Sequence, residues 1–219
     1  QQRKNRVKEV LDLVRLQGFE NRYPHELSGG QQQRIALARS LAPNPILMLL
    51  DEPFSNLDSV NRTDMLNDLQ SIIRNTNMAT ILVTHDKEVA LSVADNLAVM
   101  VDGQINQFAK PNEIYFYPKN YKVAKLISNA EFISGNVNNG VVNCLLGSFP
   151  YLDTTGQIDS TSEVTVMIRF GDFRAVYDPS GNFFVTSVEF KGSYFIVTVK
   201  SFKGSSYIKC TESLNANLT

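Results

Sequence analysis

Hydrophobic residues near the start of the chain recur at the spacing of an α-helix. Four of them lie three or four residues apart: Val7, Val10, Leu11 and Val14. Gly18 follows at a position typical of a helix C-terminus, so we predict an amphipathic helix over residues 3–17. Ser28 is a favourable N-cap, and apolar residues share one face up to Leu41, so a second helix is expected to begin at the two glycines after Ser28.

The next part of the chain alternates between strand and helix patterns. Residues 46–50 are apolar throughout, which is typical of a parallel strand covered on both faces. Residues 65–73 return to helical spacing, and residues 80–84 form a second apolar run. A further helix over residues 86–93 and a hairpin within residues 97–108 complete the pattern. The alternation predicts an α/β fold for this half.

Composition changes after Lys110, where a short helical connector is expected. From Phe132 onward the chain shows brief β-rich runs separated by turn residues, the clearest of which are residues 164–170, 183–190, 194–200 and 207–211. Lys191-Gly192-Ser193 and Lys203-Gly204-Ser205 read as hairpin turns. We therefore expect three parts: an α/β part over residues 1–108, a connector over 109–129, and a small β-barrel or sandwich over 130–219.

Length and charge limit the classes of function. A chain of 219 residues is long enough for two domains. Its net charge is −1 and its basic residues are dispersed, which argues against a nucleic-acid partner. The apolar run at residues 46–50 is far shorter than the roughly 20 residues that span a bilayer, so we expect any membrane link to go through a partner.

The start and the cysteines give two further expectations. The first ten residues have no apolar core typical of a secretory signal and no initiator Met, so we expect the sequence to be a fragment. Cys144 and Cys210 lack metal-type spacing, and we expect ordinary structural thiols rather than a disulfide or a reactive site.

An anion site is predicted where the second helix begins. Gly29 and Gly30 leave backbone N–H groups accessible at the positive end of the helix dipole, and the Ser28 hydroxyl adds a donor. A phosphate group fits such a site. The alternative at this point is that Ser-Gly-Gly is an ordinary turn.

Acidic residues follow the first apolar strand, and a histidine follows the second. Asp51 lies at the carboxyl end of its strand, where α/β sheets bind ligands, and could hold Mg²⁺ directly or through water. Glu52 could orient or deprotonate a water molecule. Because adjacent strand residues point in opposite directions, we expect the two acids to have different tasks. His85 should reach the same sheet edge, where its ring could bond a phosphate oxygen. Taken singly, each has an ordinary structural alternative.

Taken together, these motifs resemble a known family. In order they read LSGGQ at residues 27–31, RIALAR at 34–39, ILMLLDEP at 46–53, SNLD at 55–58 and THD at 84–86. This series resembles the nucleotide-binding subunit of ABC transporters over residues 1–108. The β-rich remainder resembles the OB-like accessory domain of importer subunits. The sequence of these motifs is most similar to that of ferric-iron importer ATPases, and polyamine, sugar, sulfate and thiamine importers are close behind.

The resemblance implies a role for each candidate residue. The signature motif, which would cover ATP bound to a second subunit, comprises Ser28, Gly29, Gly30 and Gln31. Asp51 would lie near Mg²⁺, Glu52 would be the catalytic carboxylate, and His85 the switch histidine. Asp58 would lie in the loop that joins the two subunits.

The resemblance also implies cofactors and partners. ATP and Mg²⁺ would be the cofactors. A second copy of the subunit would complete a homodimer on transmembrane permease subunits at the cytoplasmic face of the inner membrane, with an extracytoplasmic solute-binding protein as an indirect partner. The expected function is ATP hydrolysis coupled to solute uptake, with ferric iron as the expected solute.

Two departures from the family pattern matter. No GxxxxGK[ST] phosphate loop occurs in the chain, and this loop positions and neutralises the phosphates, so we expect no ATP hydrolysis by this chain alone. Arg169-Phe170-Gly171-Asp172 stands where relatives read Arg-Pro-Glu, which puts an inherited small-ligand role of the β-rich part in doubt. We also expect an exposed apolar surface or strand edge beside residues 46–50, and poor solubility unless this surface is paired.

Two other functions remain open at this point. The chain could be a short, inactive binding or regulatory protein, which an upstream in-frame phosphate loop would exclude. Chromosome-maintenance and DNA-repair ATPases share the signature and the Asp-Glu strand, but they carry long heptad-patterned flanks, which this sequence lacks.

Overall fold

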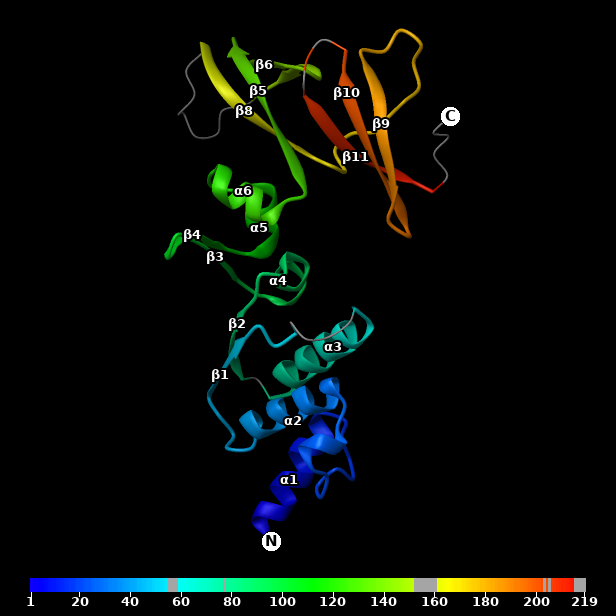
Figure 1. The fold of residues 1–219 in the computed structure, drawn as a ribbon. Coiled ribbons are helices and arrows are strands. Elements are labelled where there is room, and N and C mark those ends of the chain that lie inside the picture. Colours follow the sequence, from blue (N-terminus) through cyan, green and yellow to red (C-terminus); the bar gives the residue numbers. More distant parts are fainter. Residues whose placement is uncertain (55–58, 77, 152–160, 203, 205, 215–219) are drawn as a thin grey trace. The chain divides into compact units, whose positions relative to one another are not determined.

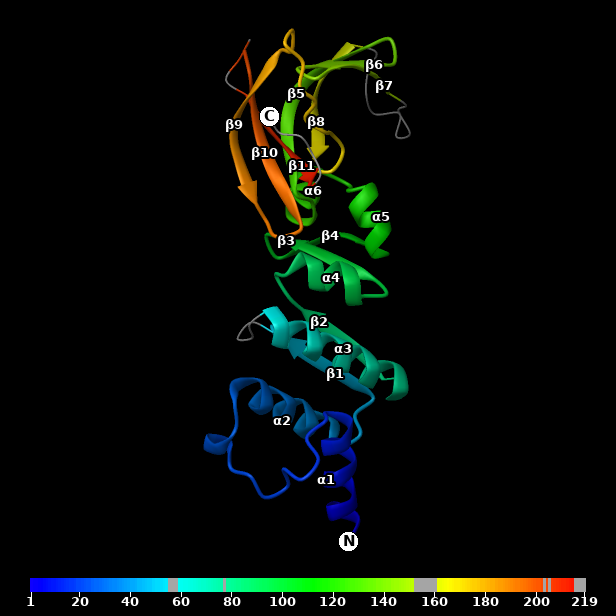
Figure 2. The same cartoon turned by 90° about the vertical axis from the view of Figure 1, so that its right-hand side faces the viewer.

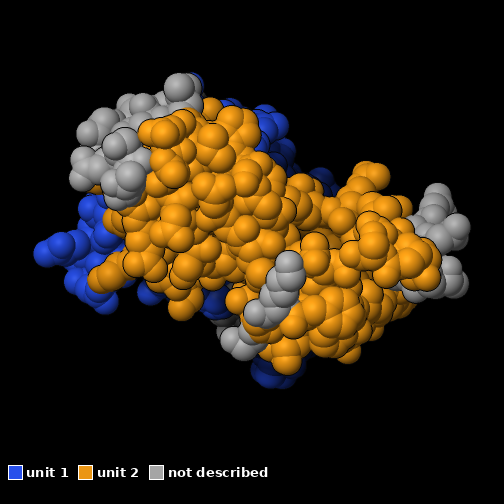
Figure 3. Space-filling view, turned by 90° about the horizontal axis from the view of Figure 1, so that it is seen from above, with its two compact units in different colours: residues 1–116 blue, residues 117–219 orange. Residues whose placement is uncertain are grey.

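The chain divides into two compact units, Gln1–Phe116 and Tyr117–Thr219 (Figures 1 and 3). The structure is a computed structural model that describes residues 1–54, 59–76, 78–151, 161–202, 204 and 206–214. The boundary between the units falls inside the predicted connector at residues 109–129. No helix in the described ranges is both long and apolar enough to cross a bilayer.

The first unit begins with two helices. Helix α1 spans Gln2–Leu13 and α2 spans Gly29–Leu41, with a short 3₁₀ helix, η1, at Pro24–Glu26. Helix α2 begins at the residue that the sequence predicts. The prediction for α1 was wrong at its C-terminal end, because Arg15 adopts a positive φ of 57° and ends the regular helix before residue 17.

Two parallel strands form the small sheet of this unit. Strand β1, Leu47–Asp51, pairs with β2, Ala79–Val83, in a register that runs from Leu47 opposite Ala79 to Asp51 opposite Val83. Helix α3, Ser59–Thr76, connects them, and α4, Lys87–Val93, follows β2. Each strand lies within one residue of its predicted position, and the predicted α/β alternation is confirmed.

A hydrophobic core joins these helices to one face of β1. The core residues are buried to at least nine-tenths and come from α1, α2, β1, α3, α4 and the segments beside them: Val10, Leu11, Val14, Leu16, Leu37, Ala38, Leu41, Met48, Phe54, Met65, Leu69, Ile72, Met78 and Val89. This is the face that the 3.6-residue spacing of the sequence marks out.

A buried carboxylate ties the helices to one another. Asp68 on α3 is 3% exposed and forms ion pairs with Arg34 of α2 and, at 3.0 Å, with Nε of Arg15. Arg34 also donates to the backbone oxygen of Val14 at 3.1 Å. A buried carboxylate is costly unless charged and polar partners compensate it, so these contacts fix how the three helical segments pack.

The other face of the two-stranded sheet is exposed. Its side chains are large and apolar: Leu47, Leu49, Ile81 and Val83. The expectation that residues 46–50 are covered on both faces is therefore wrong for this chain, because the hydrophobic core described above packs on one face only. The expected exposure of apolar surface beside this strand is confirmed, whereas poor solubility stays a prediction.

An antiparallel hairpin and a short helix complete the first unit. Strand β3, Leu97–Val101, pairs with β4, Gln104–Ala109, and Asp102 and Gly103 both adopt positive φ at the turn. Helix α5, Pro111–Phe116, follows and buries Ile114. The predicted hairpin is confirmed.

The second unit contains helix α6, Tyr121–Ile127, and two antiparallel sheets. The order of the four-stranded sheet is β7-β6-β5-β8, with bounds Ala130–Asn138 for β5, Val141–Cys144 for β6, Gly147–Pro150 for β7 and Thr161–Arg169 for β8. The order of the three-stranded sheet is β11-β10-β9, with bounds Phe183–Phe190 for β9, Tyr194–Ser201 for β10 and Tyr207–Ser213 for β11.

The four strands that were predicted in this unit are present as β8, β9, β10 and β11. The first three strands of the unit, β5, β6 and β7, were not given bounds from the sequence. Within β5, Ser134, Gly135 and Asn136 interrupt the apolar alternation. Gly135 is required by packing, because a Cβ there would come within 2.9 Å of Val166 Cγ2. The turn at Gly192 is confirmed, whereas two residues of the predicted turn at 203–205 lie outside the described residues.

A link between the two sheets is made where β8 ends. Thr211 of β11 donates its N–H to the oxygen of Phe170 at 2.6 Å. Ile133, Ile168 and Ile208 form a shared core beside it. The described strands thus make two sheets over a common core, and closure into an OB-like barrel stays a prediction.

Both cysteines of this unit are free thiols, as expected. Burial raises the pKa of the Cys210 thiol, and the nearby Glu212 carboxylate adds to the rise. A thiol with a raised pKa is a poor nucleophile at neutral pH, so the structural role predicted for Cys210 fits its environment.

The Asp68 network gives a test of the first unit. Replacing Asp68 by Asn leaves the Arg34 guanidinium without its buried counter-ion, so we expect the free energy of unfolding to fall by about 3 kcal/mol in chemical denaturation. Asp64→Asn, at an exposed position of the same helix, serves as the control. Equal stability of the two variants would contradict the role given to Asp68.

Candidate functional site

The candidate site lies where β1 and β2 reach their carboxyl ends. Glu52 directly follows β1, and its N–H donates to the oxygen of Val83 at 2.9 Å, so the parallel ladder extends one residue beyond the strand. Glu52 adopts a positive φ of 45°, a conformation that is uncommon for a residue with a long side chain. Outliers of this kind cluster at functional sites, where the surrounding structure enforces them.

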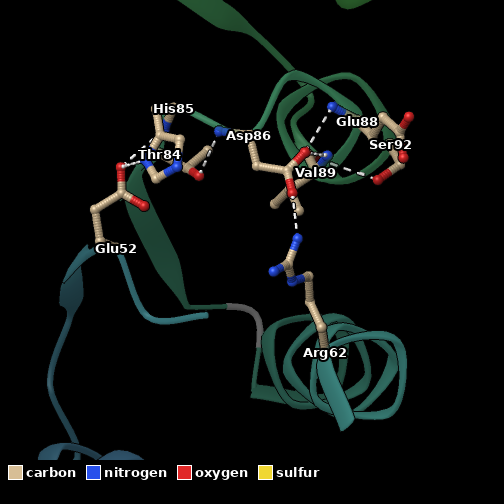
Figure 4. A network of polar contacts seen from close by, with 8 residues as sticks. All are labelled: Glu52, Arg62, Thr84, His85, Asp86, Glu88, Val89 and Ser92. Carbon is tan, nitrogen blue, oxygen red and sulfur yellow. Dashed lines mark hydrogen bonds and ion pairs between the residues drawn. The ribbon is translucent and has the colours of Figure 1, made fainter. Parts of the chain in front are cut away.

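His85 contacts the Glu52 carboxylate with both its backbone and its ring. The His85 N–H donates to Glu52 Oε1 at 2.8 Å, and the ring Nδ1 lies 2.6 Å from the same oxygen (Figure 4). The two residues are 33 positions apart in the sequence. The β1–β2 register brings them together, because both strands end at the same edge.

The electrostatics of this pair keep the carboxylate ionised. The side-chain hydrogen bond from His85 is the largest cause that lowers the pKa of Glu52, and its backbone hydrogen bond and charge act in the same direction. An ionised carboxylate oxygen can only accept, so a hydrogen bond at this contact has Nδ1 as its donor. Side-chain exposure is 33% for Glu52 and 82% for His85, so solvent and small ligands can reach both groups.

Neighbouring polar contacts fix the segment that carries His85. Asp86 caps α4 by accepting from the N–H groups of Glu88 and Val89 at 3.0 and 3.3 Å. Its own N–H donates to Thr84 Oγ1 at 3.0 Å, and its other carboxylate oxygen pairs with Arg62 of α3 at 2.9 Å. Figure 4 shows this network beside the Glu52–His85 contact. Arg62 was not among the residues predicted from the sequence, because nothing in the local pattern distinguishes it from a surface arginine.

Asp51 is the last residue of β1 and is exposed. It pairs with Val83 in the register, so it lies at the same edge as Glu52. The alternation of side chains along β1 does not fix the direction of Glu52, because Glu52 lies beyond the strand. The strand ends at Asp51, and the positive φ of Glu52 breaks the regular pleat.

Ser28 begins α2 with a capping box. Its Oγ accepts from the Gln31 N–H at 3.4 Å, and its N–H donates to Gln31 Oε1 at 3.0 Å. Ser28 and Gly29 are exposed, and a Cβ added at Gly29 would meet no atom within 4 Å. The N-terminus of α2 is thus open to an approaching group, as an anion site requires.

The structure brings together only some of the predicted site residues. Glu52 and His85 are in direct contact, and Asp51 adjoins them. The Ser28–Gln31 group lies at the far end of α2 along the chain, and its capping hydrogen bonds are made within the group itself. Asp58 lies outside the described residues.

The polar groups at the N-terminus of α2 and at the carboxyl ends of β1 and β2 suit a nucleotide with a divalent cation. Exposed N–H groups at the start of a thirteen-residue helix suit phosphate oxygens. Mg²⁺ is commonly held by one or two carboxylates together with substrate phosphates and water, so Asp51 offers a suitable ligand. Among the described residues, no group of three or more His, Cys, Asp or Glu could hold a metal ion by itself.

The chain is similar to known transport proteins. Residues 1–55 match the family model described as ABC transporter. The chain is 46% identical over 150 residues to the Fe(3+) ions import ATP-binding protein FbpC of Pseudomonas fluorescens, which covers 68% of this chain and 42% of the relative. It is 40% identical over 193 residues to the spermidine/putrescine import ATP-binding protein PotA of Clostridioides difficile, which covers 87% of this chain and 55% of the relative.

A third relative is named for a different solute. The sulfate/thiosulfate import ATP-binding protein CysA 2 of Chromobacterium violaceum is 39% identical over 187 residues, which cover 84% of this chain and 50% of the relative. The chain spans about half the length of these curated relatives. Among solved structures, CbiO1 of Clostridium perfringens, part of the ABC transporter complex cbiONQ, matches with 27% identity over 52% of this chain and 45% of that chain, with a TM-score of 0.49.

The Glu52–His85 contact predicts a measurable pKa. By carboxyl-selective NMR we expect the pKa of Glu52 to lie below its ordinary value, and His85→Gln to raise it, because the ring hydrogen bond is lost. His25→Gln, the only other histidine, is the control. Since the folded pKa is the lower one, the contribution of Glu52 to stability is complete above the unfolded pKa and is lost as pH falls through the folded pKa. An unchanged pKa in His85→Gln would contradict the contact.

Proposed function

The chain belongs to the family of ABC transporter ATP-binding proteins, and on that basis we propose that it is part of the ATP-hydrolysing subunit of an ABC importer. In this proposal the subunit lies at the cytoplasmic face of the membrane and couples ATP hydrolysis to solute uptake through permease partners. The observation that carries the proposal is the Glu52–His85 contact at the carboxyl ends of two parallel strands.

Glu52 has the properties of a group that positions and deprotonates water. Its carboxylate is held at one oxygen by two donors of His85, so Oε1 is fixed. A carboxylate kept ionised and partly exposed can accept a proton from a nearby water molecule. When bound, Mg²⁺ and ATP supply the phosphoryl group and the charge neutralisation for its transfer to that water.

The proton on Nδ1 decides what His85 can do on its other side. With Nδ1 donating to Glu52, the Nε2 of a neutral ring is an acceptor, and only the imidazolium donates from both nitrogens. His85 therefore can donate to a phosphate oxygen without releasing Glu52 only when it is protonated. A neutral His85 must exchange one partner for the other, and this exchange provides a way to sense the phosphate.

Ser28, Gly29, Gly30 and Gln31 serve a different place in the proposal. Their capping box leaves the start of α2 rigid and exposed, which suits recognition of phosphate on a second subunit. A homodimer would then have two composite sites, each with Glu52 from one copy and Ser28 from the other. Asp58 is proposed to lie between the copies.

Catalysis by Glu52 is tested in a chimera that joins a segment carrying a GxxxxGK[ST] loop, taken from an ABC ATPase, ahead of Gln1. We expect Mg²⁺-dependent ATP hydrolysis by the chimera and none by the 219-residue chain alone. Glu52→Gln should lower kcat by about 100-fold or more, because the general base is lost while the shape is kept.

The matched control is Glu113→Gln, an exposed glutamate in the first turn of α5. Its kcat should equal that of the unchanged chimera. A chimera whose kcat survives Glu52→Gln would remove Glu52 from the mechanism and leave the proposed function without its main support.

For the transported solute we propose ferric iron, with spermidine or putrescine as the second candidate. The first rests on the relative FbpC at 46% identity over 150 residues. The second rests on the PotA relative of Clostridioides difficile at 40% identity over a longer stretch of 193 residues.

Uptake of labelled solutes separates these candidates. In cells that carry the full-length subunit with its permease, we expect uptake of radioactive ferric iron to fall to background in Glu52→Gln, because transport requires hydrolysis. Uptake of labelled spermidine should stay unchanged. Loss of spermidine uptake with normal iron uptake would favour the second candidate instead.

A further inference from the structure

Strand β9 forms one edge of the three-stranded sheet in the second unit. Among the described strands it pairs only with β10, and Figures 1 and 2 both show it on the outer side of β10. The other edge is different, because Thr211 of β11 donates its N–H to Phe170 and is thereby engaged. An open edge presents unpaired backbone groups to any further strand.

The side chains of β9 are unusual for an open edge. Seven of its eight residues are exposed, and four of them are large and apolar: Phe184, Val185, Val188 and Phe190. Two of the aromatic rings are held by neighbours, Phe190 by Phe195 at 5.4 Å and Phe184 by Phe202 at 4.9 Å between centroids. Natural proteins usually protect edges with lysine, proline or charged residues, and β9 itself carries one charged residue, Glu189.

The sequence of β9 is partly symmetric about its centre, because the residues at positions 183 and 190 and at positions 185 and 188 are the same. It reads FFVTSVEF over residues 183–190. When two copies run antiparallel about a point between Thr186 and Ser187, Val185 falls opposite Val188 and Phe183 opposite Phe190. Thr186 then faces Ser187, and β-branched and aromatic pairs of this kind stabilise antiparallel strands.

The backbone of β9 fits the same register. Lys191 donates its N–H to Tyr194 at 2.9 Å, so this is a hydrogen-bonded pair. Alternation along the ladder then makes Phe190 and Val188 residues whose backbone groups point away from β10. The register shift leaves Thr186 without a paired position in the ladder, although its hydroxyl donates to the oxygen of Thr198 on β10 at 3.1 Å. Beyond this bulge Val185 lies opposite Val199, so the backbone groups of Val185 and Phe183 point outward. The outward residues are the ones that the matching sequence places opposite each other.

We propose that β9 pairs antiparallel with β9 of a second copy of this chain, about a twofold axis between Thr186 and Ser187. The contact joins two three-stranded sheets into one. A twofold interface uses the same patch on both copies and must be self-complementary, and β9 meets this condition in both side chains and backbone.

Charge is compatible with this pairing. Glu189 falls opposite Phe184 of the second copy, so the two Glu189 carboxylates are not paired with each other. Each is neutralised within its own chain by Lys191 at 2.8 Å. Because like charges directly opposite would destabilise the pair, this arrangement favours the proposed register over one centred on Glu189.

The proposal does not rest on ATP hydrolysis or on a solute. It concerns the second unit, whereas the composite site proposed above uses Ser28 and Glu52 of the first unit. Dimerisation can therefore be measured without nucleotide, and failure of either proposal leaves the other standing.

Sedimentation equilibrium of the 219-residue chain without nucleotide tests the contact. We expect a monomer–dimer equilibrium with a dissociation constant of about 100 µM or less. In hydrogen-exchange measurements, the amides of Val188 and Phe190 should exchange more slowly as the dimer forms. Val188→Lys places a charge opposite an apolar residue at the edge and should raise the dimer dissociation constant at least about tenfold. Circular dichroism should show an unchanged fold.

Two lysine variants are the controls. Val176→Lys, at an 83% exposed position outside the strands of the same unit, should leave the dimer intact. Leu49→Lys, on the exposed face of β1, tests association through the first unit. A chain that stays monomeric, or a dimer that survives Val188→Lys and is lost in Leu49→Lys, would overturn the proposal.

Discussion

The parallel pairing of β1 with β2 is the constraint on which the candidate site depends. His85 has no local reason to meet Asp51 and Glu52, since a long helix separates the two strands that they follow. The register aligns the two carboxyl ends, and the Glu52 N–H continues the ladder to Val83. The His85 backbone and ring then both reach one carboxylate oxygen. A shift of the register by one residue would separate them and would also exchange the two faces of the strand.

Packing on only one side of this sheet gives the first unit two contrasting faces. One face joins the helices through a continuous core, and the buried Asp68 with Arg34 sets how those helices pack. The opposite face exposes apolar side chains, as β9 does in the second unit. Exposed apolar faces and edges of this extent mark places where protein surface is completed by other protein. Both units thus expose apolar surface outside the Glu52–His85 pair.

Local patterns predicted the elements well where the chemistry is local. The N-cap at Ser28, the two apolar strands and the turns at Gly103 and Gly192 were placed correctly, because each depends on residues within a few positions. The pattern failed where a distant contact intervened. Helix α1 ends at Leu13, shortly before Arg15, which pairs with Asp68 of α3. In β5 the apolar alternation is interrupted by Gly135, where a larger side chain would meet Val166 on a neighbouring strand.

By itself the sequence determined the order of elements, the residue types of the candidate site and the family resemblance, because these follow from spacing and from motifs read along the chain. It also determined that Glu52 and His85 would share a sheet edge. Only the tertiary structure decided that they touch, that His85 lowers the pKa of Glu52, and that Arg62 holds the neighbouring Asp86. Burial and edge position are likewise decided there, since they depend on what packs beside a segment, which periodicity within that segment does not specify.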